Sequence, residues 1–147
     1  MPQLVEIMRP DLIEVAPEDT LGEVADRMTA VNVGAVVVKD YGRLIGILTE
    51  RDMLKAMAAR VHTSEARVRQ WMTEDPITAP EETEADAAAR LMLEHGFRHL
   101  PVVDDGGRVT GVISLRRCVA ATNVASAIAY AFIYSRGAWA GAAKAAR

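Results

Sequence analysis

Two short segments share one arrangement of residue types but differ in the charge of their last residue. They read GILTERD, ending at Asp52, and GVISLRR, ending at Arg117. In each, a glycine and apolar residues lead to a hydroxyl, Thr49 or Ser114, three positions before the end. A carboxylate one helical turn beyond a hydroxyl can accept hydrogen bonds from both hydroxyls of a ribose. A guanidinium can only donate, so Arg117 cannot make that contact.

The same residues also fit a purely structural role. Thr49 stands at a predicted strand-to-helix junction, where its hydroxyl can cap the first helical turn and Asp52 can complete the cap. The free N–H groups of such a helix start can equally meet an anion. Gly46 lets a backbone approach closely, and Ile47 offers apolar surface for an adenine face. Taken alone, this segment favours the cap, and only its place in a duplicated frame brings the ligand-binding role level with it.

These segments belong to an internal repeat that covers nearly the whole chain. Met8 and Met72 each close a short amphipathic run, which is followed by a Pro-flanked apolar run, a helical stretch and two apolar runs. The offset between the copies stays at 63 to 65 residues. Each half is therefore predicted as strand–helix–strand–strand–helix, preceded by a short helix. One half is too small to bury its apolar faces alone, so a pseudo-two-fold pair is expected.

The repeat predicts an α+β fold of two packed β-α-β-β-α units. We expect repeat one at residues 1–60, repeat two at residues 61–120, and a helical C-terminal extension at residues 121–147. Short apolar runs rich in valine are typical of buried strands. The turn sequences DYGR and DDGGR between paired runs predict hairpins.

Capping signals mark the predicted helix ends. Thr20 with Glu23, and Thr83 with Asp86, place a hydroxyl three residues before an acid, which resembles a capping box. Gly96 stands where the helix of the second repeat should stop. The helices of both halves are thus expected to begin in the same way.

Composition narrows the classes of function. Half of the 147 residues are apolar and a quarter are charged, which is typical of a soluble globular protein. A net charge of -3 argues against a nucleic-acid partner. The N-terminal segment lacks the apolar core of a signal peptide, and the longest apolar stretch, residues 124–134, is too short to span a bilayer. We therefore expect a cytoplasmic protein without membrane association.

No catalytic or metal-binding constellation stands out in the sequence. His62, His95 and His99 lack metal-ligand spacing with a cysteine or a paired carboxylate. Cys118 has no evident activating partner, and it is expected to be a reduced, buried thiol. Neither a nucleophile elbow nor a P-loop occurs. The sequence predicts that the protein is not an enzyme, holds no metal and requires no cofactor.

The ordered motifs resemble a tandem cystathionine-β-synthase (CBS) domain pair, also called a Bateman module, here as a stand-alone pair. The resemblance covers residues 3–120 and includes the proline-flanked runs, "LPVVDDGG" and "GILTERD". It implies a regulatory protein that binds AMP, ADP, ATP or S-adenosylmethionine. In that family the hydroxyl and Asp of the "GILTERD" segment commonly grip a ribose, and the other repeat completes the pocket.

The resemblance assigns residues of this chain to two pockets. The expected adenosine pocket consists of Gly46, Ile47, Thr49, Asp52, Ile77, Thr78, Arg98, His99 and Pro101. Arg98 and His99 stand where several family members keep basic residues for phosphate, although a solvated Arg beside a packed His is the structural alternative. The second, weaker pocket consists of Ile13, Val15, Gly34, Ala35, Ser114 and Arg117. We expect it to be empty or altered, because Arg117 cannot clamp a ribose and repeat one offers only the uncharged VGAV there. The alternative is that Arg116 and Arg117 contact a phosphate or a partner.

The C-terminal extension and the mode of action leave alternatives. An aromatic and aliphatic surface is expected from Ile128, Tyr130, Phe132, Ile133 and Tyr134. Packing against a second copy in a homodimer is favoured over a membrane-surface helix or a frayed end. We expect one adenosine pocket per chain, with signalling through an unknown effector protein or a change of oligomer. A ligand-free structural or protein-interaction dimer module is the rival hypothesis, and a small enzyme is the third.

Overall fold

The computed structural model describes residues 1–122 and residue 132, and these residues form two similar lobes. The first half contains α1 (Leu4–Ile7), β1 (Glu14–Val15), α2 (Leu21–Val31), β2 (Ala35–Asp40), β3 (Arg43–Thr49) and α3 (Glu50–Ala58). The second contains α4 (Val68–Trp71), β4 (Thr73–Glu74), β5 (Ala79–Pro80), α5 (Ala85–His95), β6 (His99–Val103), β7 (Val109–Ser114) and α6 (Leu115–Ala121). The predicted α+β fold and the order of elements are confirmed, with β4 as an addition.

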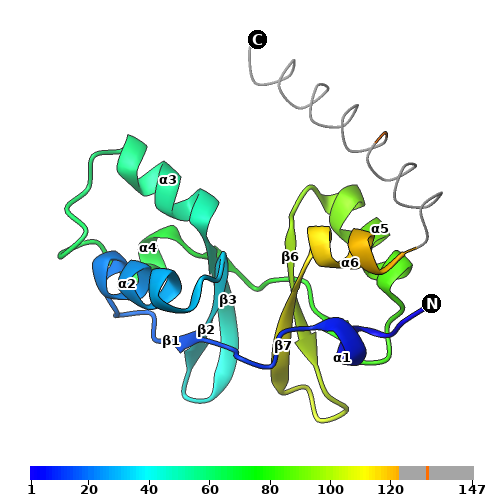
Figure 1. Ribbon diagram of the computed structural model, residues 1–147. Helices are drawn as coiled ribbons and strands as arrows, with labels where there is room; N and C mark the ends of the chain where they lie inside the picture. The colour runs from blue at the N-terminus through cyan, green and yellow to red at the C-terminus, as the bar shows by residue number, and fades with distance from the viewer. Residues whose placement is uncertain (123–131, 133–147) are drawn as a thin grey trace.

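The two sheets repeat one topology. The first has the order β1-β2-β3-β4 and the second the order β5-β6-β7. In each, a short strand runs parallel to the next strand, which pairs with an antiparallel hairpin partner. Figure 1 shows the sheets side by side, and β2 contacts β7 where they approach. We call the sheet of β1–β4 with α2, α3 and α4 the first lobe, and the sheet of β5–β7 with α1, α5 and α6 the second lobe.

The two halves exchange their short leading helices. The α1 helix of the first half lies against the second lobe in Figure 1, where Leu4 is fully buried and its N–H donates to the Thr83 carbonyl at 2.9 Å. The α4 helix packs on the first lobe, where Val68 is fully buried and its N–H donates to the Asp19 carbonyl at 2.9 Å. The expected boundaries at residues 60 and 120 therefore divide the sequence repeats, whereas the packed lobes cross them.

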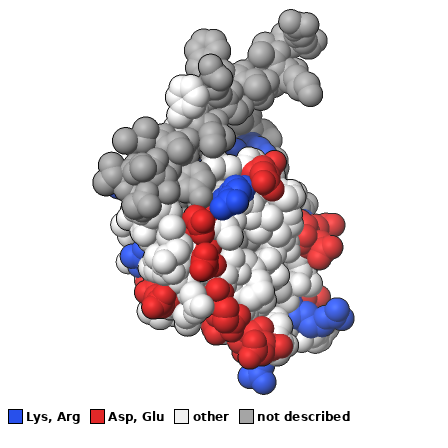
Figure 2. Space-filling model, turned by 90° about the vertical axis from the view of Figure 1, so that its right-hand side faces the viewer, with Lys and Arg blue, Asp and Glu red and all other residues white. Residues whose placement is uncertain are grey.

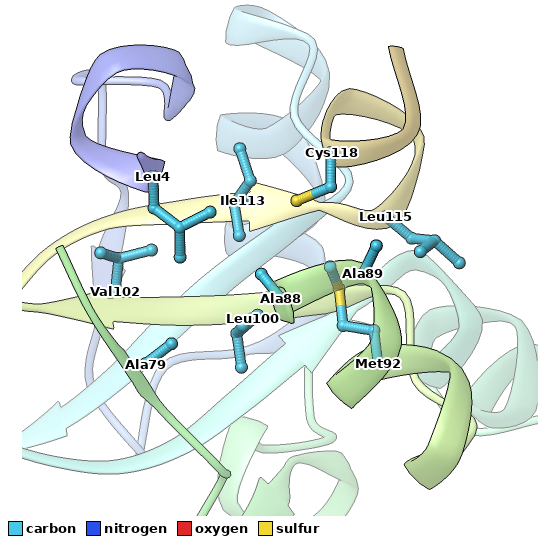
Figure 3. Close-up of a cluster of buried hydrophobic side chains, with 10 residues drawn as sticks. All are labelled: Leu4, Ala79, Ala88, Ala89, Met92, Leu100, Val102, Ile113, Leu115 and Cys118. Atoms are coloured by element: carbon cyan, nitrogen blue, oxygen red, sulfur yellow. The ribbon is translucent and has the colours of Figure 1, made fainter. Parts of the chain in front are cut away.

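Each lobe has its own apolar core. Figure 3 shows the core of the second lobe, where Leu4 from α1, Met92 from α5 and Ile113 from β7 converge with Cys118 from α6. Full burial of such side chains contributes about 1.5–3 kcal/mol each. Burial also raises the pKa of the Cys118 thiol to about 12, so the thiol stays protonated at neutral pH. The expectation of a buried thiol at this position is confirmed.

The glycine that opens each repeated motif makes room for a methionine. A Cβ atom on Gly46 would lie 2.6 Å from the Met72 sulfur, and one on Gly111 would lie 2.6 Å from the Met8 sulfur. Real Cβ atoms do not approach so closely, so these methionines pack directly over glycine backbone. The shared glycine of the two motifs thus serves the exchange of α1 and α4.

Only one of the two predicted capping boxes forms. Thr20 Oγ1 accepts a hydrogen bond from the Glu23 N–H at 3.2 Å at the start of α2, as predicted. In the second repeat the prediction is wrong, because α5 begins at Ala85 with Glu84 as its N-cap and no side-chain cap. The Thr83 backbone is instead held by a turn and by its contact with α1.

The predicted end of the helix at Gly96 is confirmed, whereas most of the predicted C-terminal extension is not described. Gly96 ends α5 with φ of 76°, in the left-handed conformation that the sequence predicted. Within residues 1–122 and 132, no helix is both long enough and apolar enough to cross a membrane. The predicted helical extension at residues 121–147 lies outside the described residues, apart from residues 121–122 and the exposed Phe132.

Candidate functional site

Two cavities contain residues of both lobes. The first, which we call the Asp52 cavity, has a volume of about 670 Å³ and is lined by Ile47, Thr49, Glu50, Arg51, Asp52, Leu54, Lys55, Thr73, Asp75, Pro76, Ile77, His95, Gly96, Phe97, Arg98 and His99. The second, which we call the arginine cavity, has a volume of about 870 Å³ and is lined by Arg9, Asp11, Leu12, Ile13, Asn32, Val33, Gly34, Ala35, Glu50, Leu93, Arg98, His99, Val112, Ser114, Leu115, Arg116, Arg117, Val119 and Ala120. Both volumes lie in the range typical of small-molecule sites.

The structure brings most of the predicted adenosine-pocket residues together. The members that line the Asp52 cavity are Ile47, Thr49, Asp52, Ile77, Arg98 and His99. The other three do not line it: Gly46 lies beneath Met72, Pro101 is buried within β6, and Thr78 lies just before β5. These three residues do not line the cavity, and their part in ligand binding stays a prediction.

The predicted second pocket also corresponds to a real cavity. Ile13, Gly34, Ala35, Ser114 and Arg117 line the arginine cavity. Val15 does not, because its side chain points into the core of the first lobe and is only 4% exposed. Alternation along the short strand β1 explains this, since Val15 faces the core while its neighbour Glu14 is exposed.

Asp52 takes part in the helix cap with Thr49, which was one of the two roles predicted for this segment. Its Oδ2 accepts hydrogen bonds from the Thr49 N–H at 2.9 Å and from the Thr49 hydroxyl at 3.1 Å. In the described part of the chain, no hydrogen bond reaches Asp52 Oδ1. No buried polar side-chain atom there lacks a partner, so Oδ1 keeps access to solvent although Asp52 is only 8% exposed. The cap therefore fixes the carboxylate while leaving one oxygen for a ligand.

Three residues form a wall that both cavities share. Glu50 of the first lobe and Arg98 and His99 of the second line each of them. The wall is tight at Gly34, where an added Cβ would lie 3.2 Å from His99 Nε2 and 3.3 Å from Glu50 Oε1. The missing side chain of Gly34 thus lets a residue of the second lobe approach the backbone of the first.

Burial changes the chemistry expected of His99. Desolvation lowers its pKa below the usual 6.5, the charge of Glu50 opposes this effect, and Arg98 adds to it. His99 is therefore mainly neutral at pH 7. A positive charge for a phosphate was expected at this position, whereas the neutral ring can offer only an N–H donor or a nitrogen acceptor.

The two cavities differ in charge. In the Asp52 cavity three cations face three carboxylates: Arg51, Lys55 and Arg98 against Glu50, Asp52 and Asp75. In the arginine cavity four arginines face two carboxylates: Arg9, Arg98, Arg116 and Arg117 against Asp11 and Glu50. The first cavity is balanced, and the second carries a surplus of two positive charges.

Arg9 is the lining residue that sequence reasoning missed. Its guanidinium donates to both carboxylate oxygens of Asp11, at 3.0 and 2.7 Å, and to the Asn32 carbonyl at 3.1 Å. The hydrogen bond from Arg9 is the main reason that the Asp11 pKa lies below its usual value. Arg9 follows the Met8 that packs on Gly111, so its place in the repeat was the available signal. The expectation that Arg98 and His99 are absent from the second pocket is wrong, because both line it.

A metal centre finds no support in the described residues. Within residues 1–122 and 132, no group of three or more His, Cys, Asp or Glu side chains is placed to hold a metal ion. Of the carboxylates that line the cavities, Asp52 takes part in a helix cap through Oδ2 and Asp11 forms an ion pair with Arg9.

Comparison with protein families decides the relationship. A model of the CBS domain matches the chain twice, at residues 4–59 and 68–123. The chain belongs to the CBS domain family. It is a tandem CBS pair, in which each match contains one of the two motifs that end at Asp52 and Arg117.

Known relatives resemble this CBS pair in sequence and in structure. An uncharacterised 17.7 kDa protein of Acidianus ambivalens is 40% identical over 103 residues, which is 69% of this chain and 62% of that protein. A CBS domain protein of Pyrobaculum aerophilum, complexed with AMP, is 25% identical with a TM-score of 0.75 over 89% of this chain and 99% of its own. The CBS domain pair of protein MJ0100, in complex with 5′-methylthioadenosine and S-adenosyl-L-methionine, is 28% identical with a TM-score of 0.71 over 80% and 92%.

Proposed function

We propose that this CBS pair is a regulatory module that binds an adenosine-containing ligand in the Asp52 cavity. The solved relatives that hold AMP, or 5′-methylthioadenosine and S-adenosyl-L-methionine, support this class of ligand. The observation that carries the proposal is the accessible Oδ1 of Asp52 inside a cavity that both lobes line. We expect the module to act by binding this ligand and not by catalysing a reaction.

The side chains that line the Asp52 cavity suit the separate parts of an adenosine ligand. Asp52 Oδ1 accepts from the ribose hydroxyls, while Thr49 keeps the carboxylate in place. Ile47 from the first lobe and Ile77 from the second, which is 39% exposed, supply apolar surface for adenine. Arg98 provides a guanidinium for a phosphate or another anionic group.

Regulation follows from a ligand that touches both lobes. Such a ligand stabilises one relative arrangement of the lobes by its difference in affinity between arrangements. The change is read by an effector protein or by a second copy of the chain. A homodimer through α3 is the favoured assembly, because Leu54 and Met57 lie three residues apart on that helix and are 63% and 72% exposed.

The test is calorimetry and thermal unfolding with adenosine, AMP, ADP, ATP, S-adenosylmethionine and NADH. At least one of these ligands should raise the melting temperature in a concentration-dependent way. Asp52→Ala should remove that rise. Glu23→Ala is the matched control, because it also removes a capping-box carboxylate from a helix of the first lobe but lines neither cavity.

The rival function is a ligand-free protein-interaction module. The exposed pair Leu54 and Met57 favours it, since unpartnered apolar side chains on a helix suit an interface. A melting temperature unchanged by all six compounds, together with a dimer that Leu54→Glu dissociates, would replace the adenosine proposal by this one. Separate assays of turnover by the purified protein test the remaining possibility of an enzyme.

A further inference from the structure

The arginine cavity concentrates positive charge in an acidic protein. Arg9 comes from the segment after α1, Arg98 precedes β6, and Arg116 and Arg117 stand in the first turn of α6. The whole chain carries a net charge of -3. Figure 2 shows that the outer face of the second lobe is acidic, with a band of carboxylates and fewer, separate basic groups. The surplus of arginine is therefore a local feature of this cavity.

Two of these arginines are not taken up by internal ion pairs. Within residues 1–122 and 132, no carboxylate lies at ion-pair distance from the guanidinium of Arg116 or Arg117. Asp11 in the same cavity is already held by both arms of Arg9, at 2.7 Å for the shorter contact. The cavity thus presents exposed guanidinium groups whose charge is not balanced by the residues that line it.

We propose that the arginine cavity binds a compound with two or more linked phosphoryl groups and does so without recognising a ribose. A planar guanidinium can donate two parallel hydrogen bonds to phosphate oxygens, and several such groups suit a chain of phosphoryl groups. Arg117 occupies the position of Asp52, so the carboxylate that would accept from ribose hydroxyls is replaced by a phosphate donor.

The neighbouring groups agree with this ligand. Ser114 Oγ accepts from the Arg117 N–H at 3.2 Å, so the hydroxyl hydrogen is left to donate into the cavity that Ser114 lines. The volume of about 870 Å³ is ample for a diphosphate or triphosphate. The site shares Arg98 with the Asp52 cavity, but it does not need the ribose contact at Asp52 on which the adenosine proposal rests.

The ligand chemistry has two possible sources, free polyphosphate and the phosphate tail of a nucleotide. Both present the same linked phosphoryl groups to the arginines. Binding in the Asp52→Ala variant separates them, because that variant removes the proposed ribose contact from the first cavity. Equal binding of ADP and GDP there indicates the nucleotide tail, and binding of pyrophosphate but of neither nucleotide indicates the free compound. Binding of ADP without binding of pyrophosphate would overturn the proposal.

The central test is calorimetry with sodium pyrophosphate in buffer free of divalent cations. One equivalent should bind, and Arg116→Ala with Arg117→Ala should weaken binding at least about tenfold, as expected for lost charge-assisted hydrogen bonds. The matched control is Arg90→Ala with Arg108→Ala, which removes the same charge from the same lobe outside both cavities. The control should change the affinity less than about twofold.

Other results would also overturn the proposal. Wild-type protein that gives no heat change with millimolar pyrophosphate lacks the site. Equal weakening by the two double variants would mean that overall charge, and not the cavity, attracts the anion. If the alanine pair lowers the melting temperature strongly, Arg116→Lys with Arg117→Lys keeps the charge but removes the planar forks. Unchanged affinity in that variant would contradict the guanidinium contacts.

Discussion

The Asp52 cavity and the arginine cavity each contain one copy of the repeated motif. The two copies differ in the charge of their last residue, Asp52 in one and Arg117 in the other. Asp52 keeps one carboxylate oxygen accessible to solvent from within a helix cap. At the matching position, the Arg117 backbone N–H donates to the Ser114 hydroxyl oxygen, and the Arg117 side chain is exposed. The frame around both is the same, with a strand, a hydroxyl at the junction and a helix. A repeated backbone can therefore hold two cavities whose lining residues differ in charge.

The largest effect is expected when Asp52 is given the charge of its counterpart. Asp52→Arg should weaken AMP binding about a hundredfold, because the ribose acceptor is lost and a second donor takes its place. Pyrophosphate binding in the arginine cavity should change less than about threefold. Calorimetry with both ligands measures the comparison, with Glu23→Ala as the control for lost capping. Retained AMP affinity would remove Asp52 from the proposed site.

The reverse exchange should have a somewhat smaller effect. Arg117→Asp restores a carboxylate three residues after Ser114 and removes one guanidinium from the arginine cavity. Pyrophosphate affinity should fall about tenfold, and a second equivalent of adenosine should bind. Titration calorimetry counts the equivalents. Unchanged pyrophosphate affinity would show that the two cavities do not differ through this position.

Stability should respond equally in the two halves to a change in the shared frame. Gly46→Ala and Gly111→Ala each force a methyl group against a methionine sulfur, and each should cost about 1–3 kcal/mol of unfolding free energy. Gly106→Ala is the control, since that glycine is exposed and has negative φ, and an added Cβ would meet only the Asp104 side chain, at 3.3 Å; it should change stability by less than about 1 kcal/mol. Denaturant unfolding gives the three values. A large difference between the first two would contradict the symmetric packing of Met72 and Met8.

The smallest effect concerns the wall between the cavities. The His99 pKa is lowered in the folded state, so the unfolded chain binds the proton more readily. Stability from the neutral ring is present above the usual pKa of 6.5 and is lost as the pH falls through the lower, folded value. His99→Gln should flatten this part of the pH profile of the melting temperature. His62→Gln, which changes an exposed histidine, serves as the control.

The sequence predicted the parts of the site that are local and repeated. The strand-to-helix junction at Thr49, the cap with Asp52 and the stop at Gly96 follow from neighbouring residues, and the structure has all three. The α5 cap failed because contact with α1 holds the Thr83 backbone, a long-range effect that no local pattern carries. Repeat logic also could not reveal that Met72 packs directly over Gly46.

The charge of the arginine cavity could not be predicted from the sequence for a similar reason. The repeat assigned a separate wall to each pocket, so Arg98 was counted for the first pocket alone. The structure places Arg98 and His99 on a wall between the cavities and brings Arg9 to the second cavity through its hydrogen bonds to Asp11 and Asn32. Which basic side chains line the same cavity depends on how the two lobes pack against each other, and that packing involves residues of both repeats.

The exchange of α1 and α4 makes the two repeats mutually dependent for folding. A chain cut in the loop between α3 and α4 would give two fragments, each carrying a helix whose buried residue, Leu4 or Val68, belongs in the other fragment. Neither fragment would contain a whole core, so neither is expected to fold alone. Mixed together, they should reassemble as complementary pieces. The module thus behaves as one cooperative unit, and a gene fusion must carry both repeats to supply either cavity.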